Sequence, residues 1–261
     1  MPRPKGIIGD VHGIPEELEE LVLWFLDQGL KPEDIWVLGD ILDRGPDSGA
    51  CVRYCRRMGI NSIKGNHEQS ILNRWTGILQ NRKFKHPNPD KEKTISQLTQ
   101  ADVDWLEALP PIHVFDDLKL ILVHGGLWPK IPLFKQPYHG IIRAQLIQPW
   151  NPGPSKWWGP KCKEVNGFTE EEMKLQGWHR WYELYDHPYD VAFGHSVFQH
   201  PMIYKNPGAG TCFGLDQGGV FGGWLTGMLY YGPGDYHIKQ IPAKKTYCVD
   251  MFKQFGRHDD E

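Results

Sequence analysis

Polar clusters rich in aspartate, histidine and asparagine interrupt the chain at five places, each beside glycine and after a short apolar run. They occupy residues 9–13, 39–45, 65–68, 124–126 and 194–195. Carboxylate oxygen, imidazole nitrogen and amide oxygen together suit borderline divalent metals such as Mn, Fe, Zn or Ni. The five clusters therefore predict a metal centre assembled from distant parts of the sequence.

The ligand types suggest two ions. Asp10 and His12, two residues apart, can both reach one ion where a strand gives way to a loop, and Asp40 could bridge this ion to a second. The second ion would take the remaining candidates, Asn66, His124 and His195. Two metals about 3.5–4 Å apart can bind both the attacking and the leaving oxygen of a phosphoryl group.

The elements that must position the first three clusters alternate between strand and helix. Apolar runs at 6–8, 35–38 and 60–64 predict strands, and helical spacing follows each of them. This alternation is typical of an α/β sheet. Because ligands bind at the carboxyl ends of strands in such sheets, the clusters should converge on one crevice.

The rest of the chain is less regular. We expect a surface loop over 81–93, a helix over 94–109 and a hairpin of strands over 112–123. Later strands are predicted at 191–193, 202–204, 225–231 and 236–241. With no internal repeat and no dividing linker, residues 1–248 should form one domain with a Trp-rich insertion at about 128–185, followed by a charged tail at 249–261.

Composition excludes some classes of function. The 261 residues carry a net charge of −3, so no global basic field favours a stable nucleic-acid complex. No apolar run is long enough to span a membrane, and no signal-peptide core follows Met1. The five cysteines form no C-x-x-C pair, which favours a reduced core over a thiolate zinc site. We expect a cytoplasmic protein.

The order GDVHG, GDILDRG, GNHE, HGG and GH resembles the PPP-type phosphatases of the calcineurin-like metallophosphoesterase superfamily. Residues 214–226 resemble a further family motif, so the resemblance covers most of the chain. It is nearest to bacterial and phage branches that include diadenosine-tetraphosphate hydrolase-like enzymes and the phosphatase module of polynucleotide kinase–phosphatase. The resemblance implies a β-sandwich flanked by helices, in α/β/β/α layers, and two divalent ions, with Mn favoured and Fe, Zn or Ni as alternatives.

The resemblance also implies roles for individual residues. His67 matches the general acid and Asp43 its orienting partner, while Arg44 matches an arginine that holds phosphate oxygens. The metal ligands matched are Asp10, His12, Asp40, Asn66, His124 and His195. Asp216 matches an aspartate behind the metal ligands. A further phosphate-binding arginine has no clear motif, and Arg143 is slightly favoured over Arg180. Glu68 fits a structural role at a helix N-terminus better than a catalytic one.

Departures from the family pattern leave the substrate open. Val197 stands where many phosphodiesterases have a second histidine, which resembles the phosphomonoesterase branch, while Gln217 and Trp224 replace commoner residues. The main hypothesis is a phosphatase that hydrolyses phosphate monoesters of phosphoproteins or nucleotides by direct attack of a metal-bridging hydroxide. The alternative is a dinucleoside-polyphosphate hydrolase. A catalytically inactive metal-binding scaffold is a third hypothesis, against which the intact His67, Asp43 and Arg44 argue.

Tryptophan is concentrated between two candidate ligands. Six of the eleven tryptophans lie between His124 and His195: Trp128, Trp150, Trp157, Trp158, Trp178 and Trp181. They could stack a nucleobase or supply a small core to a loop-rich segment, and the second reading is favoured.

Overall fold

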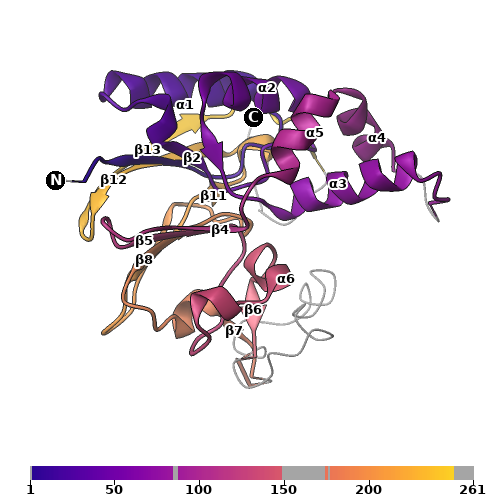
Figure 1. The fold of residues 1–261 in the computed structure, drawn as a ribbon. Helices are drawn as coiled ribbons and strands as arrows, with labels where there is room; N and C mark the ends of the chain where they lie inside the picture. The colour runs from indigo at the N-terminus through magenta and orange to yellow at the C-terminus, as the bar shows by residue number, and fades with distance from the viewer. Residues whose placement is uncertain (1, 85–87, 149–173, 176, 250–261) are drawn as a thin grey trace, which may run out of the picture.

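A computed structural model describes residues 2–84, 88–148, 174–175 and 177–249. Two β-sheets stack in the middle of the molecule, and a group of helices covers the outer face of the first (Figure 1). The helices are α1 (Pro15–Asp27), α2 (Ser48–Met58), α3 (Asn66–Leu79), α4 (Pro89–Ser96), α5 (Gln100–Glu107) and α6 (Tyr138–Ile141). The α6 helix and neighbouring loops lie against the second sheet (Figure 1). The predicted helix-flanked β-sandwich is confirmed.

The first sheet has the order β11-β12-β1-β2-β3, with β13 also paired to β12. Strands β1, β2 and β3 run parallel, and β12 is antiparallel to β1. The strands are β1 (Lys5–Ile8), β2 (Ile35–Val37), β3 (Asn61–Ser62), β11 (Asp216–Gln217), β12 (Trp224–Gly232) and β13 (Asp235–Pro242). The parallel order of the three N-terminal strands brings their carboxyl ends to one edge.

The second sheet has the order β4-β5-β8-β10-β9, in which β5, β8 and β10 run parallel. Its strands are β4 (Ile112–Phe115), β5 (Leu120–Val123), β8 (Asp190–Phe193), β9 (Met202–Lys205) and β10 (Thr211–Gly214). The predicted hairpin is the antiparallel pair β4 and β5. A separate two-stranded sheet joins β6 (Leu146–Ile147) to β7 (His179–Arg180).

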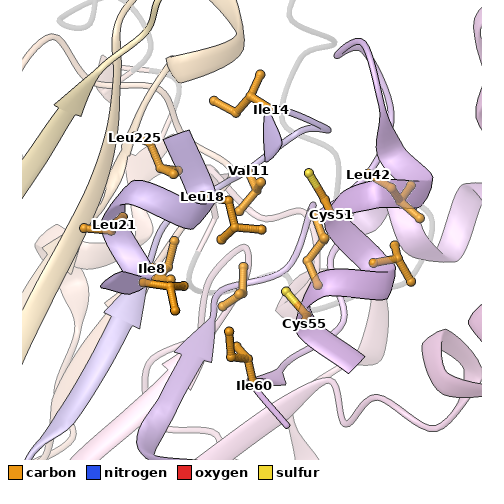
Figure 2. Packing of buried hydrophobic residues seen from close by; sticks show 14 of the residues in the cluster. Ile8, Val11, Ile14, Leu18, Leu21, Leu42, Cys51, Cys55, Ile60 and Leu225 are labelled. Carbon is orange, nitrogen blue, oxygen red and sulfur yellow. The ribbon is translucent and has the colours of Figure 1, made fainter. Parts of the chain in front are cut away.

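The core lies in layers between these elements. One cluster fills the space between the first sheet and the helices, where Leu18 of α1 lies across from Cys51 and Cys55 of α2 (Figure 2). A second cluster joins the two sheets, with Ile7 of the first packing in the same group as residues of β5, β8 and β10. Fully buried aliphatic side chains contribute about 1.5–3 kcal/mol each, so these clusters hold the strand ends in place.

The chain between α3 and β4 differs from the prediction. The prediction of a loop over 81–93 is wrong for its second half, because α4 begins at Pro89. Asn88 caps this helix, and its side chain accepts a hydrogen bond from the Lys91 amide. The single helix expected over 94–109 is divided before α5, where Thr99 caps a new helix start. Within the described residues, no helix is both long and apolar enough to cross a membrane.

Candidate metal centre

The strand ends bring all six predicted metal ligands together. Asp10 and His12 follow β1, Asp40 follows β2, and the other ligands follow β3, β5 and β8: Asn66, His124 and His195. Five of the six are buried, and His195 is half-buried. Two groups of ligand atoms each lie within 4.8 Å of one another, His12 with Asp40 and His67, and Asp40 with His124 and His195.

Asp40 occupies the middle of this cluster. Its Oδ2 lies 3.3 Å from His124 Nε2 and 3.7 Å from His12 Nε2, and these two histidines follow strands of different sheets. Its Oδ1 accepts a hydrogen bond of 2.8 Å from the His67 amide. A single carboxylate therefore faces both groups of ligands, which is the geometry that a bridging ligand needs.

Unusual backbone geometry is concentrated at the cluster. Among the described residues, His12, Asp40, Asp43, Arg44 and His195 all have positive φ angles, between 49° and 76°. Such conformations cost about 1–3 kcal/mol each outside glycine and persist where the surroundings enforce them. The fold therefore tolerates a loss of stability at these positions in order to orient these five side chains.

Glycine permits the close approach of two segments. A Cβ at Gly194 would lie 2.0 Å from Asp10 Oδ1, and a Cβ at Gly65 would lie 2.2 Å from Asp40 Oδ1. Both contacts are far below any real carbon–oxygen separation, so only glycine lets these strand ends close around the carboxylates.

Two histidines are oriented so that Nε2, the atom that can bind a metal, points toward the cluster. The Nδ1 atom of His124 lies 2.7 Å from the Leu38 carbonyl oxygen, and Nδ1 of His12 lies 3.2 Å from that of Leu42. A carbonyl can only accept, so each Nδ1 carries a proton, and Nε2 is the ring atom left to bind a metal. Such carbonyl partners are typical of metal-ligating histidines.

The electrostatics of the cluster call for a cation. Burial and the negative charges of Asp216 and Asp40 raise the pKa of Asp10 well above its ordinary value. Burial, followed by the positive charge of His124, lowers the pKa of His195 to about 3, which leaves a neutral imidazole. Burial disfavours the charged form of His124, but the charge and hydrogen bond of Asp40 raise its pKa. Buried carboxylates beside imidazoles are a donor set that fits divalent ions. The residues present therefore fit the metals that the strand-end motifs predict.

Asp216 lies behind the ligands. Its Oδ1 accepts a hydrogen bond of 2.9 Å from the Gly218 amide, and its carboxyl group also contacts that of Asp10. Asp10 Oδ1 and Oδ2 lie 3.2 and 3.1 Å from the His195 amide, which donates to them. Asp216 is thus placed to orient Asp10 and not to reach a substrate directly.

His67, Asp43 and Arg44 lie on one side of the cluster. His67 Nδ1 is 2.7 Å from Asp43 Oδ2, while its Nε2 is 3.8 Å from Asp40 Oδ2 and so faces the candidate metal ligands. Burial favours a raised pKa for Asp43, but the hydrogen bond and charge of His67 lower it to about 2. Arg44 Nη1 lies 3.5 Å from His12 Nε2, and the guanidinium packs over the Phe221 ring at 5.1 Å.

Glu68 has a structural place, as its position at a helix start predicts. The carboxylate is fully buried and accepts hydrogen bonds of 2.8 Å from three backbone amides, those of Asp40, Ile41 and Gly65. It therefore ties the loop after β2 to the start of α3. Burial and the nearby charge of Asp40 raise its pKa to about 7.

Arg143 lies within electrostatic range of the cluster, since its charge acts on Asp40 and on His195. Its backbone packs against Gly125, where a Cβ would lie 2.3 Å from the Arg143 nitrogen, and its charge interacts with Asp40. Arg180 lies on β7, paired with Leu146.

Replacing Arg143 by alanine should therefore lower kcat/KM about 10–100-fold, the cost of one or two hydrogen bonds to a charged group. Arg180→Ala should cost several-fold at most. Steady-state kinetics on one phosphate ester test this, with Arg143→Lys as the variant that keeps the charge but loses the planar fork. A larger loss from Arg180→Ala would reverse the assignment.

Added Mn²⁺ should stabilise the metal-free protein, and more so at pH 8.5 than at pH 6.5. In the folded protein the pKa of Glu68 is raised to about 7. Protonated Glu68 therefore stabilises the fold fully below the pKa that it has in the unfolded chain, and this stabilisation is lost as the pH rises through about 7. A bound cation offsets the negative charges responsible, and about 100 Kd of ligand adds about 2.7 kcal/mol per site. Thermal unfolding of EDTA-treated protein at the two pH values measures this. Equal shifts at both, or none, would contradict it.

The sequence reasoning missed residues that lie beside this centre. Lys91 and Lys93 of α4 and Tyr247 near the end of the described chain line a cleft next to His67. The two lysines fall in the segment that sequence analysis assigned to a loop, and their spacing in Lys91-Glu92-Lys93 gave no motif. Of the tryptophans singled out, Trp128 and Trp181 are buried in the core beneath the second sheet, which fits the packing interpretation. Trp150, Trp157 and Trp158 lie outside the described residues.

Comparison with known proteins agrees with this geometry. The model of the family described as calcineurin-like phosphoesterase matches residues 4–211. A symmetrical bis(5'-nucleosyl)-tetraphosphatase from Serratia proteamaculans is 26% identical over 294 residues, covering 95% of this chain and 97% of that relative. Another so named, from Hamiltonella defensa, is 37% identical over 130 residues, but the match covers only 48% of this chain and 44% of the relative.

Solved structures show the same fold. One, provisionally named a diadenosine tetraphosphatase, superposes with a TM-score of 0.68 at 23% identity, covering 92% of this chain and 93% of that one. A protein from Pyrococcus horikoshii superposes with a TM-score of 0.55 at 13% identity, covering 96% and 92%.

Proposed function

The chain belongs to the calcineurin-like phosphoesterase family, and we propose that it hydrolyses dinucleoside tetraphosphates symmetrically with the help of two divalent ions. The observation that carries this proposal is the match to a symmetrical bis(5'-nucleosyl)-tetraphosphatase across 95% of the chain, with all six ligand candidates gathered in one site. This favours the alternative of the sequence analysis over its main hypothesis, a phosphatase for phosphoproteins or mononucleotides.

The residues divide between two metal positions. Asp10, His12 and Asp40 would hold one ion, and Asp40 would share the second with the other three ligands: Asn66, His124 and His195. When bound, the ions would offset the charge of the phosphoryl group and acidify water at the site. Residues 1–248 would act as one domain, since the centre draws on strands from both sheets.

Three side chains would act on the phosphoryl group and the leaving group. Arg44 and Arg143 are placed to hold phosphoryl oxygens, because a planar guanidinium matches two of them at once. Water forms a new bond to phosphorus and releases a proton to solvent as the bond to the bridging oxygen breaks, and that oxygen keeps the electron pair. His67 Nε2 would lie beside that oxygen and give a proton to a leaving group too basic to depart as an anion, while Asp43 holds Nδ1.

A comparison of four substrates at one Mn²⁺ concentration tests the proposed function. We expect the highest kcat/KM for diadenosine tetraphosphate, ahead of a mononucleotide, a phosphopeptide and a 3′-phosphorylated oligonucleotide. The Asp40→Asn variant, prepared in parallel, controls for contaminating phosphatases. A phosphopeptide or mononucleotide preferred over diadenosine tetraphosphate would restore the phosphomonoesterase hypothesis. Bound metal without activity on any of the four would instead support the scaffold.

A further inference from the structure

A cleft of about 510 Å³ opens beside the acid candidate His67. It is bounded by Asp43 and Arg44 after β2, by α4, and by the segment that follows β13. Its volume falls within the range of about 300–1,000 Å³ that is typical of small-molecule sites. The cleft continues from the phosphoryl position, because three residues with proposed roles in the reaction form part of its wall.

The wall formed by α4 is basic. Lys91 and Lys93 both line the cleft and, with Arg44, outnumber its carboxylates Asp43 and Asp90. Of these carboxylates, Asp43 is already bonded to His67. The hydrogen bonds of the lysines go to neutral oxygens, from Lys91 Nζ to Ser70 Oγ and from Lys93 Nζ to the Gly45 carbonyl. Both ammonium groups thus keep charge available for an anionic ligand.

The segment after β13 supplies an aromatic wall. Tyr247 donates a hydrogen bond of 2.7 Å from its hydroxyl to Glu17 Oε1, and its amide donates to the Val220 carbonyl at 3.0 Å. Glu17 is fully buried and also accepts from the Lys244 amide at 2.9 Å. The Tyr247 ring is only partly buried, so it presents a fixed flat surface next to the basic wall.

The position of His67 indicates which part of a substrate enters this cleft. A general acid must reach the oxygen that departs, so the departing group lies on the side of His67. The Nδ1 atom of His67 is bonded to Asp43, and its Nε2 atom faces the metal ligands. The reacting phosphoryl group therefore lies at the metal ligands, and the departing group lies beside the imidazole of His67. The next space beside His67 is the basic cleft.

We infer that this cleft binds the leaving nucleoside diphosphate, with Lys91 and Lys93 on its phosphates and Tyr247 against its base. The inference rests on the proposed function, in which symmetrical cleavage of a tetraphosphate chain releases a nucleoside diphosphate on each side. Flexible ammonium groups suit a phosphate chain, and stacking on an aromatic ring accepts any base.

Inhibition by products tests the cleft without requiring diadenosine tetraphosphate as substrate. Hydrolysis of p-nitrophenyl phosphate is measured at fixed free Mn²⁺ with ADP, pyrophosphate or inorganic phosphate as inhibitor. In Lys91→Ala/Lys93→Ala, the Ki values of ADP and pyrophosphate should rise about tenfold or more, as expected when hydrogen bonds to charged groups are lost. The Ki of inorganic phosphate, which needs only the metal centre, should change by much less.

Further variants separate the phosphate contacts from the base contact. Tyr247→Leu should raise the Ki of ADP while leaving that of pyrophosphate close to wild type, and Tyr247→Phe should lie nearer wild type for ADP because the ring remains. Lys93→Glu reverses one charge of the cleft but keeps the hydrogen bond from Lys91 to Ser70. A weaker ADP inhibition in this variant therefore cannot be attributed to loss of that bond and local unfolding of α4. Lys205→Ala, an exposed lysine on β9, is the matched control.

The outcomes distinguish the cleft from the proposed function. An unchanged Ki for ADP in the double variant and in Lys93→Glu, or an equal rise for all three inhibitors, would overturn the cleft assignment. A wild-type enzyme that does not cleave diadenosine tetraphosphate would overturn the proposed function. If ADP inhibition of that enzyme still depended on Lys91, Lys93 and Tyr247, the cleft would stand as a nucleoside-diphosphate site.

Discussion

Replacing His67 by alanine should slow hydrolysis of an alkyl phosphate by about 10²–10⁴-fold, the usual contribution of a positioned general acid. An alkoxide is a poor leaving group and must receive a proton as it departs. The structure provides for this by fixing His67 Nδ1 on Asp43 Oδ2 at 2.7 Å and turning Nε2 toward the metal ligands. The loss on p-nitrophenyl phosphate should be much smaller, because p-nitrophenolate leaves without help.

The same variant should lose comparatively little on diadenosine tetraphosphate. Its leaving group is a diphosphate, and a terminal phosphate with a pKa near 6 is already stable as an anion at neutral pH. The measurement is kcat/KM for a series of leaving groups, with His200→Ala as the control because that imidazole is exposed on a loop. Equal losses across the series would show that His67 is not the acid.

Replacing Asp40 by asparagine should abolish most activity and metal binding together. Asp40 Oδ2 faces histidines from both ligand groups, at 3.3 Å from His124 and 3.7 Å from His12. Losing its charge should weaken both ions, and ions contribute several kcal/mol to the transition state, so the rate should fall about a thousandfold or more.

Metal content by mass spectrometry and kcat/KM on the same preparations measure this effect. Asp235→Asn, an exposed carboxylate at the start of β13, is the control and should match wild type in both. Full metal occupancy in Asp40→Asn, with activity reduced by less than about tenfold, would contradict the bridging position.

Sequence alone predicted the centre well because its ligands are marked locally. Each candidate stands beside a glycine that the structure uses for close approach, as Gly65 and Gly194 show. Helix α2 was equally readable, since Asp47 caps its start and Gly59 ends it with a φ of 76°. In such places the residue type itself reports the backbone conformation.

Elements without a local signal were missed or misjudged. Helix α4 buries a single residue, Thr94, and so lacks the apolar periodicity that identifies a helix. Its cap, Asn88 followed by Pro89, was the available sign. The place of Tyr247 could not be predicted, because its partner Glu17 lies 230 positions away in the chain. Long-range contacts of this kind depend on the packing of the whole fold.

The most direct test of the central claim is the identity of the nucleotides released from diadenosine tetraphosphate. The purified enzyme with Mn²⁺ is sampled early in the reaction and the products are separated by chromatography. We predict ADP as the sole nucleotide product, with activity lost on EDTA treatment and restored by Mn²⁺. Release of ATP with AMP, or no cleavage by an enzyme that hydrolyses phosphate monoesters, would contradict it.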